Sequence, residues 1–248
     1  MRLFTNGCSF TEGYDLPDPS MAWPSVLSNS IKYDVNNIAL GGCSNDRIFR
    51  TTIEYFNIHT APDIVIIGWT FNDRAELSHH SGVRLRLSSN ACLPDTTEMT
   101  EDLTLVHKFW TTQLHNRYLN YHAWVHSMLH LQEYFKSKNI QYLFFTAIGN
   151  DYIHEFINNT DLALELADQS WQWRDRARYA PFRNIHREYQ DLRLCIAKID
   201  LTHWVSQANY TMGQYLLNQG FKSDCTGHYH SDGHLAWANH LREYIKGV

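Results

Sequence analysis

The sequence predicts an α/β protein, a three-layer α/β/α sandwich around a mainly parallel, doubly wound sheet of the flavodoxin-like kind. Three observations predict this class. Short apolar runs alternate with longer segments of helical period. The helical segments carry apolar residues three and four apart, as helices that cover a buried sheet require. The order strand, helix, strand, helix then implies right-handed crossovers between parallel strands.

The elements follow one another in that rhythm. The apolar runs at residues 3–5, 35–40, 64–68 and 140–146 are predicted strands. Helical period predicts helices at residues 23–31, 45–58 and 103–138, and a C-terminal helix at 235–246. The segment 77–102 is polar and has no clear period, so it predicts a long excursion after the third strand rather than core. Loops of this length are often lids or binding surfaces.

Composition limits the function classes. A chain of 248 residues that is 44% hydrophobic can bury one sizeable core, and we expect a single domain over residues 1–248. The net charge of -5, without a basic block, argues against nucleic acid or an anionic membrane as partner. No apolar run reaches the roughly 18 residues of a spanning helix, and the first strand begins at Arg2. We therefore expect a cytoplasmic protein.

The five cysteines argue against two kinds of stabilised fold. Their number is odd and no two of them form a Cys-x-x-Cys pair. Both a disulfide framework and a zinc ribbon are therefore disfavoured. We expect free thiols, with Cys8 and Cys43 as small buried residues near the site.

A serine stands where the first predicted strand must turn sharply. Asn6 and Gly7 are turn formers, and Ser9 follows them with small neighbours. Because chemistry in an open α/β sheet collects at the carboxyl ends of the strands, Ser9 has the position of a nucleophile. The alternative is a plain turn that Ser9 or Thr11 caps.

Two further strand ends offer hydrogen-bond donors. Gly42 follows the second strand, and a glycine lets its backbone N–H approach a ligand closely. Asn72 follows the third strand and should lie at the same edge as Ser9. If Ser9 attacks an ester carbonyl, its own N–H, that of Gly42 and the Asn72 amide would hold the oxyanion. Taken singly, Gly42 and Asn72 are also ordinary turn residues.

A histidine-rich loop precedes the C-terminal helix, at residues 221–234. A histidine there would reach over the sheet edge to deprotonate Ser9, with an upstream aspartate fixing its tautomer. A serine, hydrogen-bond donors and a His–Asp pair thus occur in an order that ester chemistry can use.

Together these motifs resemble the SGNH (GDSL-like) hydrolase superfamily. Residues 7–12 look like its first block, 42–47 its second, 68–73 its third and the histidine loop its fifth, in agreement with the family's order and spacing. The resemblance is nearest to divergent, often phage-encoded members. It implies a serine esterase without metal or organic cofactor, acting on acetylated carbohydrate or another small ester, and it leaves virion association open.

The third block departs from the family pattern. The family usually has Gly-x-Asn-Asp, whereas Asn72 lies four residues after Gly68. Either Thr70 takes the family's glycine position or the loop is remodelled, and so either Asn72 or Thr70 completes the oxyanion site.

The fifth block departs as well. The spacing to the Gly-His pair that opens the terminal helix makes His228 the base, with Asp224 as the aspartate that orients it. However, Asp224 stands four residues before His228 rather than three. An offset alignment that pairs Asp232 with His234 is the alternative.

The segment 169–183 interleaves aromatic and basic residues, and a second excursion is expected near residues 160–190. One interpretation is an amphipathic helix with its tryptophans in the core. The other is a substrate platform, in which Trp171, Trp173 and Tyr179 stack on sugar rings. Either Arg174 or Arg176 would then meet a carboxylate.

Three function classes follow. The leading hypothesis is a serine esterase, and an O-acyltransferase would use the same acyl-enzyme with a sugar hydroxyl as acceptor. The second class is a noncatalytic carbohydrate-binding or virion structural relative. The third is a metal site in the histidine loop, which the spacing disfavours because it lacks the His-x-x-x-His of a helical zinc pair. Its potential ligands are Asp224, Cys225, His228, His230, Asp232 and His234.

Overall fold

Four parallel strands form the centre of the molecule. In the computed structural model, which describes residues 1–88, 91–94, 103–115, 117–148, 192, 194–208 and 210–245, the sheet has the order β2-β1-β3-β7. The strands are β1 (Arg2–Gly7), β2 (Asp34–Asn37), β3 (Ile64–Trp69) and β7 (Gln141–Thr146). Leu3 pairs with Val35 on one side and with Ile64 on the other. The crossover from β2 over β1 to β3 makes the sheet doubly wound, which confirms the predicted fold class.

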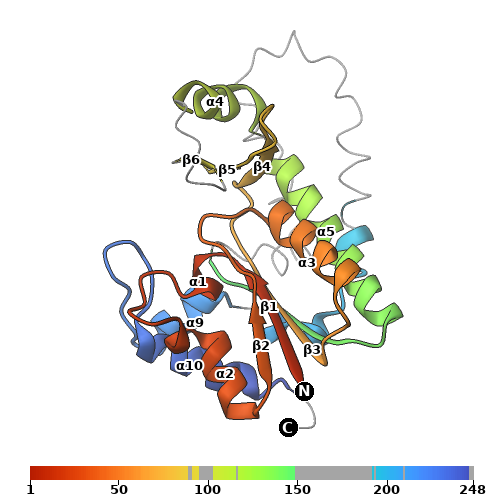
Figure 1. Ribbon diagram of the computed structural model, residues 1–248, viewed down its shortest axis with the longest axis vertical. Coiled ribbons are helices and arrows are strands. Elements are labelled where there is room, and N and C mark those ends of the chain that lie inside the picture. Colours follow the sequence, from red (N-terminus) through yellow and green to blue (C-terminus); the bar gives the residue numbers. More distant parts are fainter. Residues whose placement is uncertain are drawn as a thin grey trace.

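Helices cover both faces of this sheet (Figure 1). On one side lie α2 (Trp23–Ile31) and α10 (Ser231–Arg242), and on the other lie α3 (Asn45–Ile58) and α5 (Arg117–Ser137). All six residues of β3 are buried as a result. Its apolar run is continuous for that reason, since a strand covered on both faces has no solvent side.

The remaining helical elements are short. They are α1 (Ser9–Glu12), η1 (Pro19–Met21), α4 (Thr104–Phe109), the π-helix η2 (Trp110–Leu114), η5 (Leu201–His203), η6 (Val205–Ala208) and α9 (Met212–Asn218). Of the helices that the structure describes, none combines the length and apolar character that crossing a bilayer requires.

Three predicted boundaries differ from the structure. The predicted helix at 103–138 is divided into α4, η2 and α5. Trp110, where α4 ends, packs with Leu85 and Leu87 and not with the main core, so α4 and η2 belong to the excursion. The C-terminal helix begins at Ser231, earlier than predicted. Strand β2 ends at Asn37, before the predicted end at residue 40, and the chain turns at residues 41–42.

The excursion after β3 contains a second, antiparallel sheet. Its strands are β4 (Ala75–Ser78), β5 (Arg84–Leu87) and β6 (Cys92–Pro94). The prediction that residues 77–102 carry no core was therefore wrong for this part, since Leu85 and Leu87 are buried. Residues in β5 alternate between half-buried and buried, which is the period of a strand. In Figure 1 this sheet and α4 lie beyond the carboxyl ends of the main strands.

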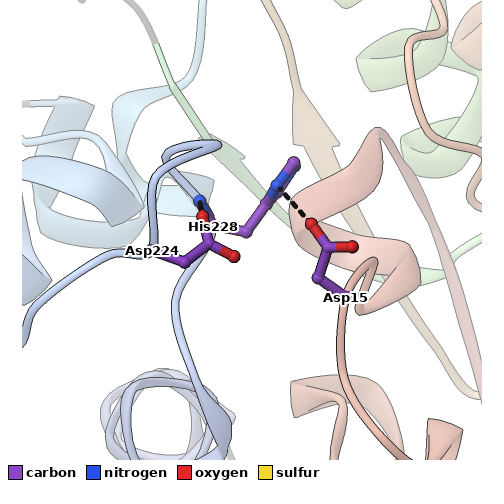
Figure 2. A group of neighbouring side chains, drawn as sticks. All are labelled: Asp15, Asp224 and His228. Carbon is purple, nitrogen blue, oxygen red and sulfur yellow. Dashed lines mark hydrogen bonds and ion pairs between the residues drawn. The ribbon is translucent and has the colours of Figure 1, made fainter.

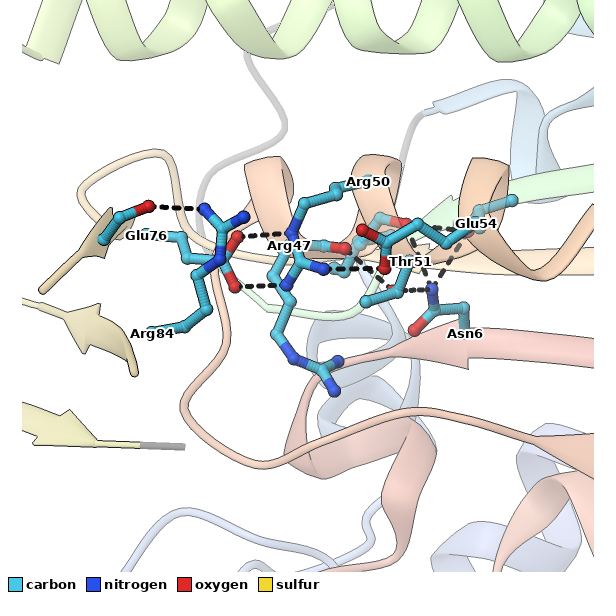
Figure 3. Close-up of polar contacts among 10 residues, drawn as sticks. Asn6, Arg47, Arg50, Thr51, Glu54, Glu76 and Arg84 are labelled. Atoms are coloured by element: carbon cyan, nitrogen blue, oxygen red, sulfur yellow. Dashed lines mark hydrogen bonds and ion pairs between the residues drawn. The ribbon is translucent and has the colours of Figure 1, made fainter. Parts of the chain in front are cut away.

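An ion pair joins the small sheet to α3. Arg50 donates from Nε and Nη2 to both carboxylate oxygens of Glu76, at 2.7 and 2.6 Å, and from Nη1 to Glu54 (Figure 3). The Glu76 side chain on β4 is only 4% exposed. A forked contact of this kind fixes direction as well as distance, so it holds β4 against α3.

Candidate active site

Ser9 lies at the carboxyl edge of the sheet, directly after β1. It is the first residue of α1 and is 6% exposed. The chain can fold back this tightly because residue 7 is glycine, since a Cβ there would come within 2.9 Å of the Gly68 carbonyl oxygen. The turn thus brings Ser9 between the ends of β1 and β3, where ligands bind in doubly wound sheets.

The loop after β2, residues 40–44, lies against Ser9. A Cβ placed on Gly41 would be 3.6 Å from the Cβ of Ser9. The N–H of Gly41 donates to Glu12 Oε2 at 2.7 Å and that of Cys43 donates to the Leu40 carbonyl at 3.3 Å. Within the described part of the chain the N–H of Gly42 donates no hydrogen bond, and its φ of +71° is one that glycine adopts without strain. This leaves Gly42 a free donor beside the serine.

Asn72 and Thr70 differ in how their donors are used. The Asn45 amide nitrogen donates to the Thr70 carbonyl and to Asn72 Oδ1, and Asn45 Oδ1 accepts the Thr70 N–H. Thr70 is buried and its hydroxyl accepts from Arg74. The backbone donor of Thr70 is therefore occupied, whereas Asn72 is held by its oxygen and its amide nitrogen donates to no described residue. This geometry favours Asn72 of the two predicted donors.

His228 reaches the same edge from the other end of the chain. Its ring packs against Phe10, the residue after Ser9, at 5.3 Å between centroids, and against Tyr14 at 5.2 Å. Within the described residues Ser9 Oγ and His228 form no hydrogen bond, although such contacts commonly tighten only when substrate is bound.

Two carboxylates flank His228 (Figure 2). Asp15 Oδ2, in the turn after α1, lies 3.3 Å from His228 Nδ1. Asp224 Oδ1 accepts the His228 backbone N–H at 3.0 Å, and it reaches the ring through Thr226. The Thr226 hydroxyl lies 2.7 Å from His228 Nδ1 and 2.6 Å from Asp224 Oδ1. With both acids on the Nδ1 side, the ring's Nε2 is the nitrogen left for Ser9.

Hydrogen bonding also sets the charge of Asp224. The hydroxyl of Thr226 and backbone N–H groups donate to its carboxylate, and they lower its pKa below the ordinary value for aspartate. Asp224 is thus held ionised beside the histidine, as a residue that stabilises an imidazolium must be.

The alternative pair, Asp232 and His234, has a different environment. His234 is 2% exposed, and its Nδ1 accepts the backbone N–H of Trp23 at 3.1 Å. Burial, with a smaller contribution from the charge of His228, lowers its pKa to about 4. Asp232 is exposed and accepts the N–H of its neighbour Gly233. His234 is thus a buried, neutral ring that bonds to the backbone of α2, and His228 stays the predicted base.

The cysteines near Ser9 are not competing nucleophiles. Cys8 and Cys43 are fully buried, and the Cys43 thiol donates to the Gly7 carbonyl at 3.2 Å. Burial raises the pKa of Cys43 to about 12, so the thiol stays protonated near neutral pH. All five cysteines lie in described parts of the chain and are unpaired.

The potential metal ligands are those of the candidate catalytic group. Ligand atoms of Asp15, Asp224 and His228 lie within 4.8 Å of one another. Of the ligands suggested by the histidine loop, Asp224 and His228 belong to this group, whereas Cys225, His230, Asp232 and His234 do not. Trp171, Trp173 and Arg174 lie outside the described residues, so the predicted substrate platform stays a prediction.

Sequence reasoning missed Asp15 and Thr226. Asp15 stands just beyond the serine motif and more than 200 residues before His228. Its φ of +66°, which aspartate tolerates better than most residues, belongs to a turn that only the folded chain reveals. For Thr226 the sequence held one local signal, its position two residues from both Asp224 and His228.

Comparisons with known proteins show a family and a likeness of fold. The sequence model of a family described as "Family of unknown function (DUF6071)" matches residues 12–163, more than half of the chain. No curated protein matches. A carbohydrate esterase family 2 enzyme with a carbohydrate-binding domain from Corynascus thermopiles (Myceliophthora fergusii) is similar, with a TM-score of 0.50, 12% identity and coverage of 98% of this chain and 64% of that chain.

Two further solved structures are similar over nearly their whole length. One is a member of the lipolytic protein G-D-S-L family from Veillonella parvula DSM 2008, with a TM-score of 0.44, 14% identity and full coverage of both chains, 100% and 100%. The other is a psychrotrophic esterase from Pseudoalteromonas sp., with a TM-score of 0.47, 10% identity and coverage of 99% of this chain and 96% of that chain. At such identities the likeness is one of fold.

Proposed function

The chain belongs to the family of unknown function DUF6071, and from the arrangement of its side chains we propose that it is a serine esterase. One observation carries the proposal. The His228 ring has the Asp15 carboxylate 3.3 Å from its Nδ1. The same ring packs against Phe10, which directly follows Ser9 at the switch point of the doubly wound sheet. A serine, a histidine and an acid around one turn are the components of nucleophilic acyl transfer.

Each residue has a defined task in the proposed reaction. Ser9 Oγ attacks the ester carbonyl carbon while His228 Nε2 takes the hydroxyl proton. The negative charge that develops on the carbonyl oxygen is held by the N–H groups of Ser9 and Gly42 and by the Asn72 amide. His228 then gives its proton to the leaving alcohol, and water attacks the acyl-enzyme by the same route. Asp15 and Asp224 stabilise the transient imidazolium.

The substrate class is proposed from the sequence resemblance. It is an acetyl ester on a carbohydrate or on another small alcohol. An O-acyltransferase would form the same acyl-enzyme and pass the acyl group to a sugar hydroxyl instead of water. Acetate release that does not fall when a sugar acceptor is added distinguishes the hydrolase.

Hydrolysis of p-nitrophenyl acetate tests the proposal. Ser9→Ala should lower kcat by at least about a thousandfold and abolish labelling by a fluorophosphonate probe. Ser30→Ala, on the exposed end of α2, is the matched control and should keep both. If the folded Ser9→Ala protein retains wild-type turnover, or if wild type neither turns over nor labels, the chain is not a serine esterase.

A further inference from the structure

Three arginine side chains gather around the loop of residues 40–44. Arg86, on β5, donates from Nη1 to the Gly41 carbonyl oxygen. Arg74, in the connection between β3 and β4, donates to the Cys43 carbonyl at 3.3 Å. Arg47 lies in the first turn of α3, where its backbone N–H donates to Ser44 Oγ at 3.3 Å. All three guanidinium charges act on the buried Cys43 thiol and lower its pKa against the larger effect of burial.

Two of these charges have no described counter-ion. Arg74 bonds to a carbonyl and to the Thr70 hydroxyl, and it lies 5.2 Å from the ring centroid of Phe71. No acid among the described residues forms an ion pair with it. Nε and Nη1 of Arg47 are buried and form no hydrogen bond within the described part of the chain. Figure 3 shows its side chain turned away from the neighbouring Arg50–Glu76 pair. A buried guanidinium without a partner is costly, so such a group normally meets an anion.

The carboxylates near this loop do not fill that role. Glu12 accepts the Gly41 N–H, and Glu76 is bound by Arg50. Oδ1 of Asp73 is buried without a hydrogen-bond partner among the described residues. Asp46 forms no ion pair with the described arginines, and burial raises the pKa of its carboxyl. Among the described residues, none of these acids forms an ion pair with Arg47 or Arg74.

The same loop supports the candidate nucleophile. Gly41 packs on Ser9, and Cys43 is hydrogen-bonded to the β1 residue Gly7. A ligand whose ester group lies at Ser9 and Gly42 therefore has guanidinium groups beside it. Arginine presents paired donors that match the oxygens of carboxylate and phosphate groups.

We propose that Arg47 and Arg74, together with Arg86, form a subsite for an anionic group of the substrate, a carboxylate or a phosphate. This inference rests on the proposed esterase function, because it assigns the substrate class of the same site. The enzyme then acts on acidic esters, such as an acetylated acidic sugar, in preference to neutral ones.

Matched esters test the subsite. Two anionic probes carry the charge on the alcohol side of the ester, 4-acetoxybenzoate and 4-acetoxyphenyl phosphate, and their neutral reference is 4-acetoxybenzamide. One probe carries the charge on the acyl side, mono-4-nitrophenyl succinate, and its neutral reference is 4-nitrophenyl butyrate. Wild type should prefer at least one anionic probe over its neutral partner. The preferred probe shows whether the anion is a carboxylate or a phosphate and on which side of the ester it lies.

Substitution of the arginines should remove that preference. Arg47→Gln should lower kcat/KM for the preferred anionic ester by about tenfold or more, chiefly through KM, and change the neutral ester less than about twofold. Arg74→Gln is a second variant with the same expectation. Arg2→Gln, at the opposite end of β1, removes the same charge and should affect neither ester. Equal losses for anionic and neutral esters, or no loss for either, overturn the proposal.

Binding separates this inference from the esterase proposal. Calorimetric titration of 4-acetoxybenzoate and inorganic phosphate into the Ser9→Ala protein should show binding by at least one of them that Arg47→Gln abolishes. If Ser9-dependent turnover of neutral esters is present but no anion is preferred or bound, the esterase stands and the subsite does not. If turnover is absent and Arg47-dependent binding is present, the subsite stands and the esterase does not.

Discussion

His228 and His234 stand six residues apart in one segment, yet the folded chain gives them opposite environments. The ring of His228 is partly exposed and faces acids, whereas His234 is buried and accepts the N–H that begins α2. Spacing alone left both as candidate bases. Packing separates them. The His234 ring is buried and completes a backbone hydrogen bond, so its replacement should lower the free energy of unfolding.

The buried position of His234 predicts a pH dependence of stability. Its pKa in the folded protein is about 4, below the ordinary value of roughly 6.5 in an unfolded chain. As the pH falls from 6.5 to 4, the unfolded chain takes up a proton that the folded protein refuses, so this contribution to stability is lost over that window. Between pH 7 and pH 5 the loss should be about 2 kcal/mol.

Urea unfolding of His234→Gln at pH 7 and pH 5 measures this effect. The variant should be less stable than wild type at pH 7, and the difference should narrow at pH 5. His230→Gln, exposed in the same loop, serves as the control and should follow wild type at both values. A wild-type stability curve that is no steeper than that of His234→Gln would contradict the assignment.

Asp15 and Asp224 predict shared support of His228. Asp15→Asn and Asp224→Asn should each lower kcat for p-nitrophenyl acetate by about tenfold, and the double variant by more than about a hundredfold, because either acid can stabilise the imidazolium. Asp34→Asn, exposed at the other end of the sheet, should leave kcat unchanged. An effect confined to Asp224→Asn would mean that Asp15 is only a surface neighbour.

At the scale of elements, the small sheet depends on α3 through one ion pair. Arg50 bonds both Glu54, whose side chain is 56% exposed, and Glu76, whose side chain is 4% exposed. The exposed partner sits one helical turn away, and pairs of that kind contribute only about 0.3–0.5 kcal/mol. The pair with Glu76 joins α3 to β4, and loss of the Glu76 charge removes the buried counter-ion of the Arg50 guanidinium.

Glu76→Gln should therefore destabilise the small sheet by about 2 kcal/mol, since it weakens a buried charge pair. Hydrogen exchange of the β4 and β5 amides should become faster while that of β3 stays slow. Glu54→Gln is the matched control and should change exchange little in either sheet. Equal acceleration in both variants would show that burial of Glu76 does not matter.

At the scale of the whole molecule, the described residues form two hydrophobic clusters. The main one surrounds the parallel sheet, and the second consists of Leu85, Leu87 and Trp110 with partly buried neighbours. Because the second cluster is small and β5 contacts the loop of residues 40–44 through Arg86, its loosening should alter substrate range before it alters the fold. The single domain expected from chain length stays a prediction.

Leu87→Ala tests this division. Removal of a buried leucine costs about 2–5 kcal/mol, and here the loss should fall on the small sheet. The midpoint of global unfolding should fall less in Leu87→Ala than in Leu27→Ala, which leaves a cavity in the main cluster. Relative rates for small and bulky esters should shift more than the rate for p-nitrophenyl acetate. Equal loss toward every ester would count against a lid role for the excursion.

Local signals were sufficient for much of the fold. The bounds of α2 and α3 agree with their predicted helices, because Pro24 lies in the first turn of α2 and Ser44 caps α3. The small sheet was missed because its strands are three or four residues long, and an alternation such as that of Arg84 to Leu87 is too short to stand out in a polar segment.

The sequence by itself determined the fold class, the order of the main strands and the candidates Ser9, Gly42, Asn72 and the histidine loop, since hydrophobic period and turn chemistry are local properties. Only the tertiary structure decided which groups meet there. The contact between Asp15 and His228, the bond from Trp23 to His234 and the arginines around residues 40–44 join segments far apart in the chain. Such contacts depend on how helices and loops pack against the sheet, which no short segment encodes.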